Sequence, residues 1–211
     1  MTKVVIVGAG VAGINAATKL VDNNFKGNIV IIDMGKNPYD RLPEEVMTGM
    51  LGAGGWSDGK LTYHTSIGGQ LSKYCGNEKA MELMDQVINN FKRFHPKPEE
   101  VQCSNPVAEP DFIKPYFGLR LFPVWHVGTD YLHEIGKNWY DYLVDNGVKF
   151  IWETKVTDIN FNKQLVSFNN GSHPLNSRIQ KISSINYDQL IFGVGKSGID
   201  FGKKLAEEYE S

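Results

Sequence analysis

Short apolar runs and an amphipathic segment alternate at the start of the chain. Residues 3–8 and 28–33 are mostly apolar, and each run has the length of a buried strand. Between them, residues 11–23 repeat small and aliphatic side chains at helical spacing. Strands that alternate with a helix are typical of a βαβ unit, in which the two strands are parallel.

A stripe of apolar residues predicts a helix over residues 77–94, with Asn77 as its N-cap. The stripe consists of Met81, Met84, Ile88, Phe91 and Phe94. We interpret it as core or interface packing rather than as a cofactor contact. Repeated prolines predict an irregular segment over 96–118, and a short strand is expected within 119–125.

Two further helices are predicted in the second half of the chain. One has Thr129 or Asp130 as its N-cap and ends near Asn146, where Gly147 provides a left-handed stop. The other begins at about Ser197 and continues toward the end of the sequence.

The remaining pattern predicts strands and one long loop. Residues 148–153 form a strand, 155–162 and 164–170 form a hairpin or meander, and 188–195 form a last buried strand. Residues 34–74 contain eight glycines and few helix signals, so they are predicted to form a long loop. A loop of this length in a compact domain is usually functional or disordered, and its aromatic and aliphatic content argues against disorder.

The first βαβ unit carries a glycine fingerprint. Gly8, Gly10 and Gly13 have the G-x-G-x-x-G spacing between a strand and a helix, and Asp33 follows at the end of the next strand. This context is typical of dinucleotide binding, because the glycines allow a tight turn, a close pyrophosphate and close helix packing. The predicted contacts at this turn are Gly8, Ala9, Gly10, Val11, Ala12 and Gly13. The start of the helix offers free N–H groups to phosphates. The Asp33 carboxylate can accept hydrogen bonds from ribose hydroxyls, and its negative charge disfavours a 2′-phosphate. The motif by itself does not distinguish FAD from NAD.

Composition excludes several other classes of function. The 211 residues are 41% hydrophobic and 22% charged with a net charge of −2, which is ordinary for a globular protein and offers no footprint for nucleic acid. The apolar runs are too short for a membrane helix, and the start of the chain predicts no signal peptide, so we expect a cytoplasmic protein. Cys75 and Cys103 have no metal-ligand spacing, so we predict free thiols and no metal.

Several motifs resemble the two-dinucleotide-binding-domain flavoproteins of the glutathione-reductase-like class. More narrowly, they resemble a family of largely uncharacterised bacterial FAD-dependent dehydrogenases. The motifs are VVIVGAGVAG at 4–13, IIDMGKNPYDR at 31–41, GAGGWSDGKLT at 52–62, HVGTDYL at 126–132, ETKVTDI at 153–159 and YDQLIFGVGKSG at 187–198. They follow the family order, and GGWSDGKL is the narrowest marker.

The resemblance implies an α/β fold: a Rossmann-like FAD/NAD(P)-binding three-layer fold with a small antiparallel β-meander and an inserted helical segment. It implies one FAD-binding domain over residues 1–211, in which about 70–125 form a helical or irregular insertion. The implied cofactor is FAD rather than NAD.

The resemblance also assigns roles by position. The glycine turn would hold the FAD pyrophosphate, Asp33 would bind the adenosine ribose, and the backbone of Val156 would bond adenine. The segment that ends at Gly195 would lie near the cofactor. The residues implied to border the ribose are Met34, Gly35 and Lys36, and those on a loop toward the flavin are Gly54, Gly55, Ser57, Asp58 and Lys60.

Several single residues keep two interpretations each. Lys60 either places a positive charge near the flavin or is a phosphate or surface lysine, while Asp58 either orients Lys60 or caps a turn. Ser57 either donates to a phosphate or stabilises the turn.

Four more residues are open in the same way. His126 is either a general acid/base or a structural histidine beside a helix cap, and Arg41 is either a phosphate partner or a solvated loop residue. Trp56 and Trp125 pack either on the cofactor rings or in the core. No catalytic residue is assigned.

Members of the resembled family are considerably longer than this sequence. They continue through a substrate domain and return with a Gly-Asp motif that binds the ribityl chain of FAD. We therefore expect a second polypeptide, a C-terminal half or self-association to complete the fold, and an exposed apolar face at that place.

The predicted function is FAD-dependent oxidoreduction, as in a flavin-dependent dehydrogenase, with no substrate assigned. One alternative is a non-catalytic FAD-binding subunit or a truncated or vestigial module. Another is a thiazole-synthase-like protein that uses NAD, because GAGGW resembles the glycine loop of that group.

Overall fold

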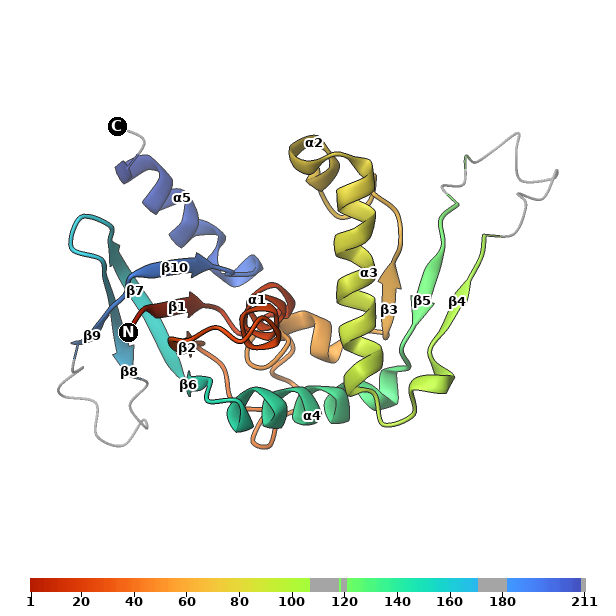
Figure 1. Ribbon diagram of the computed structural model, residues 1–211, viewed down its shortest axis with the longest axis horizontal. Helices are drawn as coiled ribbons and strands as arrows, with labels where there is room; N and C mark the ends of the chain where they lie inside the picture. The colour runs from red at the N-terminus through yellow and green to blue at the C-terminus, as the bar shows by residue number, and fades with distance from the viewer. Residues whose placement is uncertain (107–117, 119–120, 171–181, 210–211) are drawn as a thin grey trace. The chain divides into compact units, whose positions relative to one another are not determined.

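In the computed structural model, which describes residues 1–106, 118, 121–170 and 182–209, four apolar strands pair in parallel (Figure 1). Their order in the sheet is β10 (Gln189–Phe192), β1 (Lys3–Val7), β2 (Asn28–Ile32) and β6 (Lys149–Ile151). Helix α1 (Val11–Asp22) connects β1 to β2 and confirms the predicted βαβ unit. The sheet belongs to the first of two compact units, which comprises residues 1–56 and 136–211.

A second, antiparallel sheet covers one face of the parallel sheet. It is a meander of β7 (Thr154–Asn160), β8 (Leu165–Asn170) and β9 (Ile182–Asn186). Side chains alternate across a strand, so Val5 and Val7 point to the same face and pack in one buried cluster with Ile159 and Val166 of the meander. Leu205 of helix α5 (Ile199–Tyr209) joins this cluster. The predicted hairpin or meander over 155–170 is therefore confirmed.

Helices α1 and α4 form the third layer of the unit. The Cγ2 atom of Ile6 lies 3.1 Å from the position that a Cβ on Gly13 would occupy, so α1 lies against the face of β1 opposite the meander. The indole Nε1 of Trp139 on α4 (Leu132–Asp145) donates a 2.7 Å hydrogen bond to Thr18 on α1, and both side chains are fully buried. The fold is thus α/β and Rossmann-like with three layers, as predicted.

Helix α4 ends as its sequence predicts but begins differently. Gly147 has a φ of +84°, and its N–H bonds to the carbonyl of Val144 while the N–H of Val148 bonds to that of Leu143. This is the Schellman arrangement that a C-terminal glycine permits. At the other end, Gly128 rather than Thr129 or Asp130 precedes the first turn, which is a 3₁₀ turn over Thr129–Tyr131. The predicted cap was therefore wrong by one or two residues.

The second compact unit covers Ser57–Ile135 and contains more regular structure than predicted. In its described part, β3 (Lys60–Thr62), β5 (Val124–His126) and β4 (Gln102–Ser104) form an antiparallel sheet in that order. The helices are α2 (Leu71–Cys75) and α3 (Asn77–Phe94). Strand β3, helix α2 and a 3₁₀ turn over Gly52–Trp56 lie where a loop over 34–74 was predicted, and β4 lies in the segment predicted to be irregular.

Two details of this unit also differ from the prediction, and a third agrees with it. Gly76 precedes α3, so Asn77 is its first residue and not its cap. The short strand expected within 119–125 begins at Val124, and residues 119–120 lie outside the described part. The stripe on α3 is buried at Ile88, Phe91 and Phe94, as expected for packing.

Strand β10 is an edge strand rather than the predicted buried one. Among the described residues it pairs only with β1, and Phe192 is 41% exposed. The helix that follows begins at Ile199, after a 3₁₀ turn over Lys196–Gly198. No helix in the described part of the chain has both the length and the apolar character needed to cross a membrane.

Candidate functional site

A cleft with a volume of about 410 Å³ lies in the first unit, where β1, β2 and β10 end. The carboxyl ends of parallel strands are the usual place for ligands in such sheets. Of the predicted site residues, those that line the cleft are Gly8, Gly10, Val11, Ala12, Asp33, Met34, Gly54, Val156 and Gly195. Other residues line it as well, and those from the loop that follows β2 are Met47, Thr48, Leu51, Gly52 and Ala53.

The three fingerprint glycines meet different local demands. Gly8 has a φ of +105°, and a Cβ there would lie 2.5 Å from the carbonyl oxygen of Gly193. A Cβ on Gly13 would lie 2.0 Å from the carbonyl oxygen of Gly8, so a side chain would push α1 away from the sheet. A Cβ on Gly10 would meet only that Gly193 oxygen, at 4.0 Å. Space beside Gly10 is therefore open to a ligand, while Gly8 and Gly13 are closed by backbone.

The start of α1 opens onto the cleft without a capping group. Gly10 occupies the N-cap position, no described side chain caps the helix, and its first turn contains no acidic residue. The N–H groups of the first turn have no partner within the helix and carry part of the positive end of its dipole. Val11 and Ala12 line the cleft at this point, so the arrangement suits an anion.

The Asp33 carboxylate joins three backbone segments around the cleft. Its Oδ2 accepts the N–H of Ala9 at 2.8 Å, and its Oδ1 accepts the N–H groups of Gly35 and Gly49, each also at 2.8 Å. A carboxylate has about four acceptor positions, so these bonds leave about one for a ligand hydroxyl. Ala9 is fully buried and does not line the cleft. Ala9 therefore has a structural role: its N–H donates to Asp33, and its carbonyl accepts the N–H of Leu51 at 2.8 Å.

Arg41 is neither solvated nor free for a phosphate, and both sequence interpretations of it were wrong. Only 6% of the residue is exposed. Its guanidinium donates to backbone carbonyls of the segment that follows it, which are those of Glu45, Val46, Met50 and Gly52. Burial lowers the pKa of Arg41 to about 10, against the opposing effects of Asp33 and Glu45. The guanidinium also lies over the Trp56 ring, 5.5 Å from its centroid.

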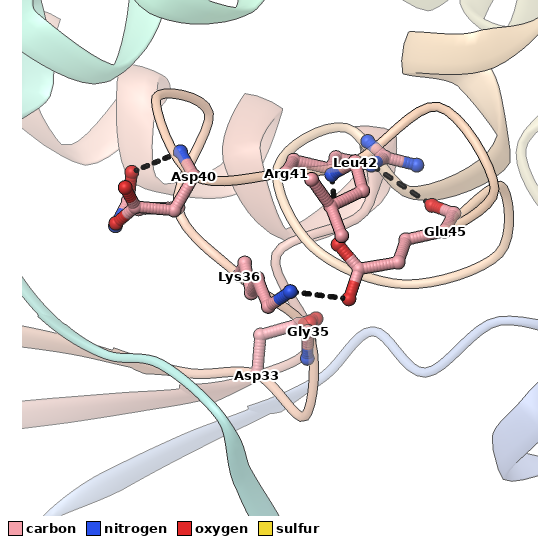
Figure 2. Close-up of polar contacts among 8 residues, drawn as sticks. Asp33, Gly35, Lys36, Asp40, Arg41, Leu42 and Glu45 are labelled. Carbon is pink, nitrogen blue, oxygen red and sulfur yellow. Dashed lines mark hydrogen bonds and ion pairs between the residues drawn. The ribbon is translucent and has the colours of Figure 1, made fainter.

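Lys36 lies beside this segment but is engaged by Glu45 (Figure 2). The Lys36 Nζ and a Glu45 carboxylate oxygen are 2.9 Å apart, and Glu45 accepts the N–H of Leu42 at 2.8 Å. The hydrogen bond that Lys36 donates to Glu45 raises the pKa of Lys36. The hydrogen bond from the Leu42 N–H lowers the pKa of Glu45, and the bond from Lys36 lowers it further. Neither Lys36 nor Gly35 lines the cleft.

A second glycine turn borders the same cleft. Gly193, Gly195 and Gly198 repeat the spacing of Gly8, Gly10 and Gly13. They lie between β10 and α5, while the first set runs from the end of β1 into the first turn of α1. Strands β1 and β10 are parallel neighbours with Val7 opposite Phe192, which brings the two turns together. Lys196 and Ser197 of the second turn also line the cleft. The repeated G-x-G-x-x-G spacing was the sequence signal that could have identified them.

The meander supplies another wall of the cleft. Thr154, Lys155 and Val156 line it from the start of β7. The register between β7 and β8 shifts between Val156 and Asp158, so a β-bulge or other irregularity lies directly after the residue that was expected to contact adenine. Bulges are common beside binding sites because they redirect one residue of the strand.

Ser57, Asp58 and Lys60 belong to the second unit, and the structure gives them local partners. The Asp58 and Lys60 side chains form a 3.0 Å ion pair, and the Ser57 hydroxyl accepts the N–H of Gly59 at 3.3 Å. His126 on β5 has its Nε2 2.8 Å from the Ser104 hydroxyl. The Lys92 ammonium lies 3.7 Å from the ring centroid of Trp125.

Comparison with known proteins supports the fold. No protein-family model matches the chain, and no curated protein matches it. Among solved structures it is similar to a flavoprotein/dehydrogenase from Cytophaga hutchinsonii, with 18% identity, a TM-score of 0.50 and coverage of 99% of this chain and 42% of that one. It is also similar to BexE, studied for oxidation during BE-7585A biosynthesis, with 16% identity, a TM-score of 0.52 and coverage of 93% and 32%.

These two likenesses show a common fold. The chain spans less than half the length of either protein. Any activity of a whole protein with this fold is therefore a matter for proposal.

Proposed function

We propose that this chain binds FAD in the cleft beside Gly10 and forms the FAD-binding part of a flavin-dependent oxidoreductase. The observation that carries the proposal is the glycine turn at the uncapped start of α1, with Asp33 at the end of the neighbouring strand and open space between them. FAD, when bound, supplies the ability to accept a hydride or electrons, and the chain supplies position and polarity.

The glycine turn fits a pyrophosphate. Gly10 leaves room for the phosphates, and the N–H groups of Val11 and Ala12 supply donors at the positive end of the α1 dipole. Lys196 and Ser197, on the second turn, also line the cleft and would add a cation and a hydroxyl. Gly8 allows the tight turn and lines the cleft with its backbone, whereas Gly13 allows the close packing of the helix.

The rim near Asp33 fits the adenosine half. Asp33 would accept a ribose hydroxyl with its remaining acceptor position, beside Met34. Val156, which lines the cleft just before the register shift in β7, would face the adenine. Lys36 is held by Glu45 and Gly35 is buried, so we propose that these two residues support the rim rather than contact the cofactor. Roles for Ser57, Asp58 and Lys60 toward the flavin are carried over from the sequence resemblance.

A non-catalytic FAD-binding subunit that works with another polypeptide is the second candidate. One observation favours it: among the described strands β10 lies at the edge of the parallel sheet, and its residue Phe192 is 41% exposed. An edge strand with exposed apolar side chains is suited to pairing with a further strand. A partner chain or a second copy would then complete the flavin side.

Identification of the bound small molecule tests the proposal. The purified chain is heated, and the released compound is identified by mass spectrometry. We expect FAD. An NAD-derived adenylate would instead support the thiazole-synthase-like alternative and contradict the assignment of a flavin.

A further inference from the structure

The segment from Glu45 to Gly52 forms one wall of the cleft, and its backbone is unusual. Gly49, Leu51 and Gly52 all have positive φ, at +86°, +62° and +52°. This region is unfavourable for a residue with a Cβ such as Leu51. Such a conformation persists only where its surroundings hold it in place.

Two side chains of opposite charge hold this wall in place. One is buried and binds its backbone carbonyls, and the other is half-buried and binds one of its backbone N–H groups. Arg41 donates to the carbonyls of Glu45, Val46, Met50 and Gly52, while Asp33 accepts the N–H of Gly49. Leu51 donates its own N–H to Ala9, next to Gly10. As a result, Leu51 is only 1% exposed, and a Cβ on Gly52 would lie 3.5 Å from the Cα of Gly10.

We infer that Arg41 is a positioning residue, which holds the Glu45–Gly52 wall in its binding geometry before the nucleotide enters. This inference rests on the proposed function for the identity of the nucleotide. Arg41 itself would not touch the ligand, because its donors are directed to backbone carbonyls. A lysine has one nitrogen in place of the planar guanidinium and cannot reach carbonyls at these separate positions together.

Hydrogen exchange on the ligand-free protein tests the wall directly. The reporters are the amides of Gly49, Leu51 and Gly52, which donate to Asp33, Ala9 and Gly49 respectively. We expect them to be protected in the wild type without nucleotide, and to exchange about tenfold or more faster in Arg41→Lys. Arg93→Lys, on the exposed face of α3, is the matched control and should leave them unchanged.

FAD titration of the same variants supplies the functional readout. Arg41→Lys should weaken FAD binding about tenfold or more, with exchange in β1 and β2 unchanged. Unprotected wild-type reporters, which need no variant to fold, would overturn the inference. So would unchanged reporter exchange or unchanged FAD affinity in a folded Arg41→Lys protein. If the wild type itself fails to bind FAD, the proposed function fails, and the exchange result alone decides the role of Arg41.

Discussion

At the scale of single residues, identical residue types have different roles in this site. Gly8 and Gly13 are closed off by backbone, whereas Gly10 faces open space. Asp33 and Arg41 each form several hydrogen bonds with backbone groups. These two charged side chains therefore fix the backbone around the cleft as well as contributing charge near it. The sequence predicted the place of Asp33, but it could not predict that of Arg41, because the carbonyls it satisfies come from a loop without a regular pattern.

Alanine substitutions at Gly13 and at Gly10 should separate an effect on stability from an effect on FAD binding. Gly13→Ala forces a Cβ against the Gly8 carbonyl and should destabilise the protein by about 3 kcal/mol. Gly10 has a φ of −69°, and a Cβ there would have no close neighbour. Gly10→Ala should therefore change the free energy of unfolding by less than about 0.5 kcal/mol and weaken FAD binding about tenfold or more. Thermal unfolding and FAD titration measure the two effects. Tight FAD binding by a folded Gly10→Ala protein would place the pyrophosphate elsewhere.

Glu45 should contribute stability that depends on pH. Its folded pKa lies below the ordinary value of 4.5, so its contribution is present above pH 4.5 and is lost as the pH falls through the lower folded pKa. Glu45→Gln should therefore unfold at a lower temperature than wild type at pH 7, and the difference should shrink toward acid pH. Thermal midpoints between pH 7 and acid conditions check this, with Glu44→Gln as the exposed control. A difference that is the same at every pH would show that charge is not its cause.

At the scale of elements, long periodic or strongly punctuated segments could be predicted and short ones could not. The β1–α1–β2 unit, the stripe on α3 and the glycine stop of α4 each have a local signal. Strand β4 consists of Gln102, Cys103 and Ser104, which show no alternation of apolar and polar residues. It forms a strand because β5 lies beside it and pairs with it. The edge position of β10 depends on strand order, which its apolar composition does not encode.

The contact between α1 and α4 gives a prediction at this scale. Thr18→Val keeps the shape of the side chain but leaves the buried Trp139 N–H without its 2.7 Å acceptor. We expect a loss of about 1–3 kcal/mol in the free energy of unfolding, measured by chemical denaturation. Thr18→Ser, which retains the hydroxyl, should lose less. Equal losses in the two variants would indicate that packing, rather than the hydrogen bond, joins these helices.

At the scale of the whole molecule, the groups proposed for the adenosine diphosphate half of FAD all lie in one compact unit. The glycine turn, Asp33 and Val156 surround one cleft, while Ser57, Asp58 and Lys60 belong to the other unit. The adenosine diphosphate half should therefore bind to this chain whether or not a further polypeptide completes the flavin side.

Titration of the ligand-free chain with FAD, followed by flavin fluorescence and by competition with ADP, tests the central claim most directly. The account predicts saturable FAD binding, with displacement of FAD by ADP. Binding of FAD that ADP does not displace, or no binding of either nucleotide by the folded chain, would contradict it.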